Sequence, residues 1–281
     1  MRLIKLNKNK LTDFVIYFIL IFCSILVISP ILWTFSTSLK TPADISRFPP
    51  TWIPRPFTFE HYRQLLFESS FFLFTFNTCI VAFSSIVLTL VVAIPSAYVA
   101  ARYEFSGKNA ILFIILVTSM MPGIATLPAL YMISIKSGLY DTFLVLILVF
   151  SAWRAPTAMW LLRGFIATIP KELEEAAMMD GCSRFGGFFR VVLPLICSGL
   201  AAVSVLVFIF VWNTWIFATT LTNSPSKSLI TVGLYANISD IGIKWGTFTA
   251  YSILAILPVI VIYLSAQKYF IAGLASGARK G

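Results

Sequence analysis

The chain has few charged residues for its length. Only 11% of its 281 residues are Asp, Glu, Lys or Arg, whereas 59% are hydrophobic. A soluble domain carries about 25% charged residues, so this chain has too few polar side chains to cover a water-exposed surface. The composition therefore excludes a soluble globular protein and predicts an integral membrane protein whose surface is covered by lipid.

Cysteine and histidine are also scarce. The four cysteines lie mostly inside apolar runs, and their spacing is not that of metal ligands. Cysteines in such positions are typical of small buried hydrophobic residues. The single histidine, His61, has no Cys or His partner in the sequence. We therefore expect no metal site and no histidine-based catalytic triad.

A phosphate-binding loop is missing as well. Such a loop needs Gly-x4-Gly-Lys-Ser/Thr to surround phosphates with backbone N–H groups. The nearest candidate, at Gly107-Lys108-Asn109, has Arg102 in place of the first glycine and Asn109 in place of Ser or Thr. We therefore expect a protein that is not an enzyme and does not itself hydrolyse ATP by that route.

Six apolar segments are long enough to cross about 30 Å of hydrocarbon as helices, which takes about 20 residues each. Strands are excluded because the segments are too long and do not alternate. Prolines inside most segments indicate either ordinary bundle packing or bent helices around a cavity that opens and closes. The sequence predicts a single all-α membrane domain over residues 1–281, with spans at about 14–36, 71–97, 110–133, 143–162, 195–217 and 247–266.

The net charge of +10 comes from Lys and Arg at the ends of the apolar segments. That distribution is typical of a membrane topology signal and argues against a nucleic-acid partner. With the N-terminus inside, the inner segments hold thirteen basic residues and the outer segments seven, and Arg154 lies within a span. The excess predicts a multi-pass protein with both termini and the loop around Pro170 in the cytoplasm.

The stretch "PKELEEAAMMDGCSRFGGFF", at 170–189, places a charged helix between two spans. Its acidic residues fall in the first turns, where negative charge suits the helix dipole. Leu173, Ala176 and Ala177 are three and four residues apart and share a small apolar face. Gly181 offers the unrestricted backbone that a helix end needs. The pattern predicts a helix-turn-helix elbow that docks into a partner's groove.

This stretch is similar to the EAA loop of ABC importer permeases, in which Glu-Ala-Ala is followed by a glycine four residues later and then by Leu-Pro. The matching residues here are Glu175, Ala176, Ala177, Gly181, Leu193 and Pro194. With "SLKTPADI", "VWNTW" and "QKYFIAGLASGARKG", the chain resembles MalG-like permeases of carbohydrate importers along nearly its whole length. The resemblance implies the MetI-like fold, with the EAA loop at about 169–194.

The resemblance also implies partners. These would be a second homologous permease, two ATP-binding subunits that hold ATP and Mg, and an external solute-binding protein that delivers a carbohydrate to the bacterial inner membrane. The external segments 38–70 and 220–245 would meet the solute-binding protein. A non-sugar or acidic solute is an alternative cargo. An ion-driven secondary transporter is a weaker alternative, because it would usually need a carboxylate inside a span and none is found there.

In such an importer the elbow would be the coupling helix, which fits a cleft on the ATP-binding subunit. Glu175 would pair with a basic group there, Ala176 and Ala177 would allow close packing, and Gly181 would set the bend. Gly186-Gly187 departs from the family, since relatives usually carry bulkier residues at these positions. The residues assigned to coupling by the resemblance are Glu175, Ala176, Ala177, Asp180, Gly181 and Pro194.

Arg154 is expected near the middle of the fourth span. A charge there costs about 2.5–3.5 kcal/mol on insertion scales and usually faces the bundle interior or water. Its partner would be backbone carbonyls, the companion permease or the substrate, so its role is either structural or in the substrate pathway. Trp212 and Asn213 are further pathway candidates, although tryptophans also favour membrane interfaces and asparagine also bonds between helices.

Overall fold

The computed structural model describes residues 10–239 and 242–277, and side chains at 13–239 and 242–267. The chain divides into two compact units. Unit 1 combines residues 1–69 with 236–254, and unit 2 combines residues 70–235 with 255–281. The basic residues Arg2, Lys5, Lys8, Arg279 and Lys280, on which the predicted orientation partly depends, lie outside the described residues.

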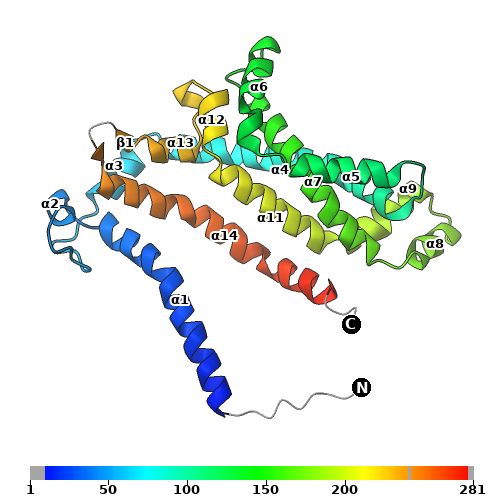
Figure 1. Cartoon of the computed structure of the whole chain (residues 1–281), viewed down its shortest axis with the longest axis horizontal. Helices are drawn as coiled ribbons and strands as arrows, with labels where there is room; N and C mark the ends of the chain where they lie inside the picture. The colour runs from blue at the N-terminus through cyan, green and yellow to red at the C-terminus, as the bar shows by residue number, and fades with distance from the viewer. Residues whose placement is uncertain (1–9, 240–241, 278–281) are drawn as a thin grey trace. The chain divides into compact units, whose positions relative to one another are not determined.

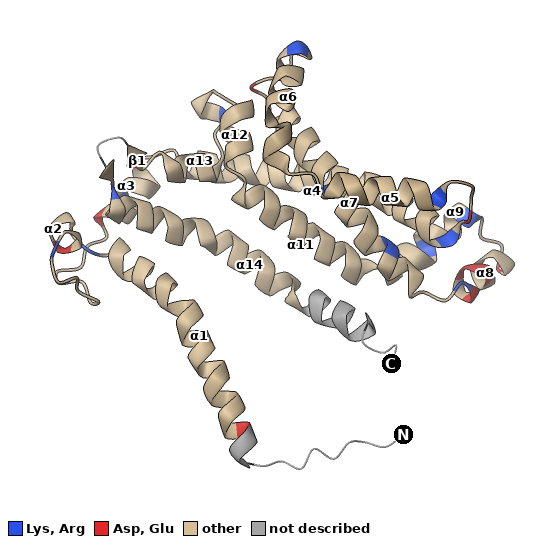
Figure 2. Cartoon of the chain, in the orientation of Figure 1, with Lys and Arg blue, Asp and Glu red and all other residues tan. Residues whose placement is uncertain are grey.

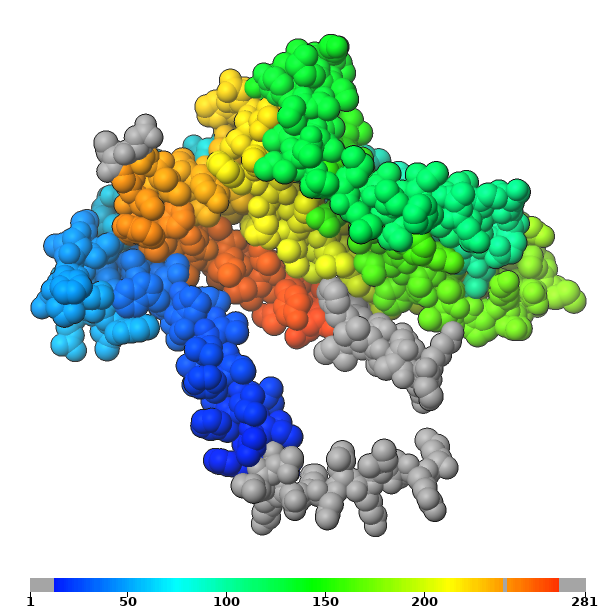
Figure 3. Space-filling view, in the orientation of Figure 1, coloured from blue at the N-terminus to red at the C-terminus, as the bar shows by residue number. Residues whose placement is uncertain are grey.

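Unit 1 is built around one long apolar helix. Its elements are α1 (Lys10–Ser38), α2 (Pro42–Ile45), α3 (Glu60–Phe67), β1 (Ile238–Ser239), β2 (Gly242–Ile243) and the start of α14 (Trp245–Gly277). The two short strands pair antiparallel. The apolar window of α1 buries none of its residues, and its large side chains stand exposed along the helix (Figure 3).

The segment that follows α1 is ordered by polar contacts within unit 1. The Nζ atom of Lys40 donates to the Thr51 carbonyl at 2.5 Å and lies 4.2 Å from the ring centre of Trp33. A ring nitrogen of His61, Nε2, lies 3.0 Å from the Lys40 carbonyl oxygen. The single histidine is therefore buried and contacts backbone.

Unit 2 is built on three helices that pack on one another, α4 (Phe71–Arg102), α7 (Phe143–Ala167) and α11 (Cys197–Asn213) (Figure 1). Small residues of α4, including Ala82, are fully buried, which lets the helices approach closely. The remaining elements are α5 (Lys108–Ser119), α6 (Gly123–Lys136), α8 (Glu172–Met179), α9 (Arg184–Gly187), the π-helix η1 (Phe188–Val192), α10 (Leu193–Leu195), α12 (Ile216–Leu221), the 3₁₀-helix η2 (Pro225–Lys227), α13 (Ile230–Tyr235) and the rest of α14.

Between four and six of the predicted spans correspond to apolar helices of the described residues. Four described helices are long and apolar enough to cross a membrane, and two bent helix pairs raise the number to six when each pair is counted as one span. The span predicted at 110–133 is broken, because α5 and α6 meet at 92°. Pro122, with extended backbone at φ −68° and ψ 121°, separates them, and proline disfavours helical backbone at the residue before it.

Two other boundaries differ from the prediction. The span predicted at 195–217 stops at Asn213, because the backbone of Thr214 is extended. At its other end, the helical segment Arg184–Leu195 meets α11 at an angle of 70°. The span predicted to end at Ala97 continues as α4 to Arg102. The prediction followed the apolar run, which ends near Ala97, whereas the helical hydrogen bonds continue to Arg102. This extra turn of α4 carries two residues of the site described below.

Charged side chains in unit 2 are sparse along the packed helices. They gather around α8 and α9 and at the neighbouring helix ends (Figure 2). A charge inside a bilayer is costly, whereas a charge at a water-exposed helix end is not. The region around α8 and α9 is therefore the part of unit 2 best suited to contact with water or with a soluble partner.

Candidate functional site

The stretch at 170–189 forms the predicted helix-turn-helix elbow. The first arm is α8, and the second runs through α9, η1 and α10. Gly181, at φ +87°, makes the turn in a left-handed conformation that favours glycine. The side-chain oxygen of Ser183 then accepts a hydrogen bond from the Gly186 N–H at 3.1 Å and caps the second arm. The prediction of a bend at Gly181 is confirmed.

The first arm has one face turned inward and one turned outward. Glu174 and Ala177, three residues apart, are buried, whereas Glu175 and Ala176 are exposed. The expectation that Ala177 packs against a partner together with Ala176 needs correction, because the i, i+3 spacing places Ala177 beside Glu174 inside the chain. The other residues assigned to coupling, Asp180, Gly181 and Pro194, are exposed.

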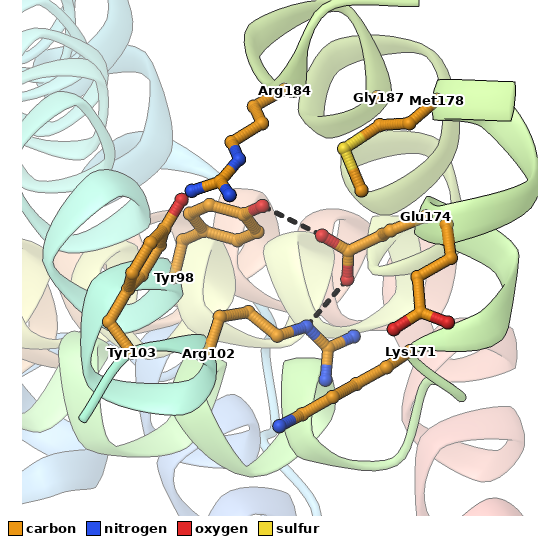
Figure 4. Close-up of a pocket in the computed structure, with 9 residues that line it drawn as sticks. Tyr98, Arg102, Tyr103, Lys171, Glu174, Met178, Arg184 and Gly187 are labelled. Carbon is orange, nitrogen blue, oxygen red and sulfur yellow. Dashed lines mark hydrogen bonds and ion pairs between the residues drawn. The ribbon is translucent and has the colours of Figure 1, made fainter.

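Glu174 connects the elbow to the last turn of α4 (Figure 4). Its Oε1 atom accepts from the Arg102 Nε atom at 2.5 Å, and its Oε2 atom accepts from the Tyr98 hydroxyl at 2.7 Å. The side chains of Arg102 and Glu174 are only 8% and 12% exposed. The Nη2 atom of Arg102 also donates to the Ile169 carbonyl at 3.0 Å, just after α7. This buried ion pair joins α4, α8 and the end of α7.

The second arm contacts the same turn of α4. The ring of Phe188, in η1, packs edge-on against the ring of Tyr98 with centroids 4.8 Å apart. Phe188 is buried. Tyr98 and Arg102 are four residues apart and so lie on one face of α4. One turn of α4 therefore holds both arms of the elbow.

A cavity of about 310 Å³ opens between the elbow and the end of α4. Besides the residues just described, it is lined by Lys171, Glu175, Met178 and Arg184 (Figure 4). Side chains of both signs border it. Glu175 lines the cavity and is exposed, so its carboxylate is accessible to a charged side chain from another protein.

Sequence reasoning missed the contacts of Glu174. It assigned Glu174 only to the helix dipole, and it placed Tyr98 and Arg102 after the end of a span. The four-residue spacing of Tyr98 and Arg102 was the one available signal, because it places both side chains on one face if the helix continues beyond Ala97. Their partner, Glu174, lies 76 residues after Tyr98 and 72 residues after Arg102, and no local pattern identifies a partner at that distance.

A second cavity in unit 2, of about 450 Å³, lies between α7 and α11. The structure brings Arg154 and Asn213 together on its wall. The guanidinium carbon of Arg154 lies 3.5 Å from the ring centre of Phe210, on α11. Its Nε atom is buried and has no hydrogen-bond partner among the described residues. An aromatic ring within its own chain was not among the partners expected for Arg154.

Trp212 does not join Arg154 and Asn213 at this cavity. Its side chain is buried, its ring stacks on Phe208 with centroids 5.0 Å apart, and its indole N–H donates to the Ala255 carbonyl at 3.0 Å. These contacts fix α11 against α14. Trp212 is not among the residues that line the cavity beside Arg154, and its contacts in this structure are packing contacts.

The loop after α12 is held on two sides. The carboxylate of Asp141 accepts from the backbone N–H groups of Asn223 and Ser224 at 2.9 and 3.0 Å, and from the Ser224 hydroxyl at 2.5 Å. Together these bonds, led by the Ser224 hydroxyl, hold the pKa of Asp141 well below its usual range. On the other side, the amide of Asn77 donates to carbonyls of the loop. The loop is thus a fixed surface.

Residues 90–275 match the family described as binding-protein-dependent transport system inner membrane component. Among the similar curated proteins is a diacetylchitobiose uptake system permease protein of Streptomyces coelicolor, 31% identical, with 91% of this chain and 92% of that protein covered. Another is a trehalose transport system permease protein of Mycobacterium tuberculosis, 34% identical, with coverage of 90% and 92%.

The fold also matches a solved structure. A bacterial ABC transporter involved in the import of the acidic polysaccharide alginate superposes with a TM-score of 0.81. The match covers 96% of this chain and 100% of that chain, at 23% sequence identity. At this identity the match establishes the fold, which confirms the predicted importer-permease architecture.

Proposed function

The chain belongs to the family of binding-protein-dependent transport system inner membrane components, and we propose that it is the permease subunit of an ATP-driven importer for a carbohydrate. The similar curated proteins serve the uptake of diacetylchitobiose and the transport of trehalose. Both relatives align over about nine-tenths of this chain, so the aligned region includes the elbow. A saccharide is the cargo that this similarity supports best.

The elbow supports coupling to an ATP-binding subunit, and this is the observation that carries the proposal. Glu175 and Ala176 are exposed, one charged and one small, beside a cavity of about 310 Å³. A basic group of the ATP-binding subunit would pair with Glu175, while Ala176 permits close approach of the two surfaces. ATP and Mg would be held by that subunit. The excess of basic residues in the inner segments supports a cytoplasmic position for the elbow and both termini.

Two further surfaces support a second permease as partner. The apolar window of α1 buries none of its residues. The cavity between α7 and α11 presents apolar side chains around Arg154. A companion permease would cover apolar surface of this kind, together with lipid. The fixed loop at 222–228 and the ordered segment after α1 would meet the external solute-binding protein.

An acidic saccharide is a second cargo that one observation favours. Arg154 presents a cation at a cavity wall, and its Nε atom has no hydrogen-bond partner among the described residues. A carboxylate or sulfonate on a sugar would pair with such a cation. The ring of Phe210 already contacts the guanidinium, however, so the structural role of Arg154 is the one we favour.

The proposal is tested by co-expression with the companion permease, the ATP-binding subunit and the solute-binding protein. The purified complex is reconstituted into vesicles, and uptake of labelled neutral and acidic oligosaccharides is measured with and without ATP. We expect uptake of a saccharide that requires both ATP and the solute-binding protein. ATP-independent uptake by the isolated chain would contradict the proposal.

A further inference from the structure

We propose that Glu174, Arg102 and Tyr98 form a latch that transmits movement of the elbow directly to α4 during transport. The inference rests on the proposed function, in which the elbow docks on an ATP-binding subunit. It assigns a positioning role to three residues whose bonds to one another lie within this chain. The latch is defined as the Glu174 carboxylate with its two donors on α4.

If the covalent chain alone transmitted movement of the elbow, only α7 and α11 would be displaced, because they are the helices joined directly to its two arms. The first arm follows α7 and the second arm leads into α11, whereas α4 has no covalent link to either arm. The latch supplies that missing link. Through it, displacement of α8 pulls on α4, and α4 packs along both α7 and α11. The three central helices of unit 2 would then move together.

The contacts of the latch suit the transmission of force. Glu174 uses both carboxylate oxygens, at 2.5 and 2.7 Å, and both donors come from one turn of α4. The ion pair is nearly buried, so water does not readily replace either partner. Removal of one partner from such a pair is strongly destabilising. A surface pair, by comparison, contributes little and separates easily.

Contacts of Tyr98 and Arg102 with other elements make the attachment rigid. Tyr98 contacts Glu174 with its hydroxyl and Phe188 with its ring. It therefore holds both arms at a fixed distance from α4. Arg102 adds the bond to the Ile169 carbonyl between α7 and α8. The elbow cannot rotate on its two covalent hinges without breaking one of these bonds.

A control ion pair lies two residues beyond Arg102. Lys108 Nζ donates to Glu104 Oε1 at 2.7 Å, and the Glu104 side chain is 89% exposed. Glu104→Gln therefore removes a carboxylate and an ion pair from the same region without touching the latch. It serves as the matched control for Glu174→Ala and Arg102→Met.

The experiment compares the reconstituted complex with these variants and with Tyr98→Phe. Complex yield, ATP hydrolysis stimulated by the loaded solute-binding protein, and saccharide uptake are measured on the same samples. We expect Glu174→Ala and Arg102→Met to assemble and hydrolyse ATP while uptake per ATP falls about tenfold, within the usual range of coupling energies. Glu104→Gln should match the wild type, and the double variant should be no worse than either single change.

Each other outcome also decides the question. If purified variants keep the wild-type uptake per ATP and lose only yield, the latch is a folding contact and the proposal is wrong. If Glu174→Ala does not assemble, Tyr98→Phe decides, because it removes one hydroxyl and leaves the ring against Phe188. Unchanged uptake per ATP in Tyr98→Phe would then overturn the latch. A wild-type complex without ATP-driven uptake would overturn the proposed function itself, and the latch with it.

Discussion

The guanidinium carbon of Arg154 lies 3.5 Å from the centre of the Phe210 ring. A cation over an aromatic face contributes about 0.5 to 2 kcal/mol, and more as water is excluded. This is smaller than the cost of about 2.5–3.5 kcal/mol for an arginine near mid-membrane. The ring of Phe210 thus partly offsets the burial of the only cation that the sequence places inside a span.

A double-mutant cycle tests this relationship. We expect Phe210→Leu to destabilise the complex more when Arg154 is present than in the Arg154→Gln background, with a coupling energy of about 1 kcal/mol. Thermal unfolding of the purified complex measures it, and uptake of neutral and acidic saccharides is measured in parallel. Arg154→Gln should lower complex yield. A selective loss of acidic-sugar uptake with normal yield would instead assign Arg154 to the substrate pathway.

Glu175 should be needed for docking and not for folding. Its carboxylate is exposed and has no ion-pair partner among the described residues. We expect Glu175→Lys to insert normally but to retain at least tenfold less ATP-binding subunit on co-purification, because like charges at an interface cost several kcal/mol. Glu68→Lys, the same charge change at an exposed site in unit 1, is the control. Normal co-purification and uptake in Glu175→Lys would count against the coupling role.

Two glycines of the elbow should respond to alanine in opposite ways. Gly181 has φ +87°, so Gly181→Ala strains the backbone by about 1 kcal/mol although the space around the new methyl group is empty. Gly187 has helical angles, φ −59° and ψ −43°, and also has open space. Gly187→Ala should therefore stabilise the second arm by up to about 1 kcal/mol. Hydrogen exchange of the elbow amides measures both, and equal effects would refute the assigned turn.

Asp141 should stabilise the loop at 222–228 over the whole physiological pH range. Its pKa is lowered on folding, so its contribution is complete above the unfolded value of about 3.9 and is lost only as pH falls through the lower folded value. Exchange protection of the Asn223 and Ser224 amides, corrected for intrinsic rates, should be equal at pH 7 and pH 5. Asp141→Asn should reduce it by about 1–2 kcal/mol, since a charged acceptor becomes neutral.

The sequence by itself determined the class of protein, the spans and the elbow. These features depend on short-range patterns, because a bilayer requires continuous apolar runs and a helix turn requires a residue such as Gly181 within a few positions. The family resemblance was visible for the same reason, since the motif around Glu175 is contiguous. The break between α5 and α6 also had a local signal, the proline at position 122. The angle of 92° between the two helices had none.

Only the tertiary structure decided which residues meet across helices. The pairing of Glu174 with Arg102 spans 72 residues, and it also explains why Ala177 faces inward while Ala176 does not. The ring of Phe210 beneath Arg154 and the turn of Trp212 toward Ala255 depend on how α7, α11 and α14 are rotated. Nearly every position of such a helix is apolar, so periodicity does not indicate which side faces a neighbour. Packing alone selects that side.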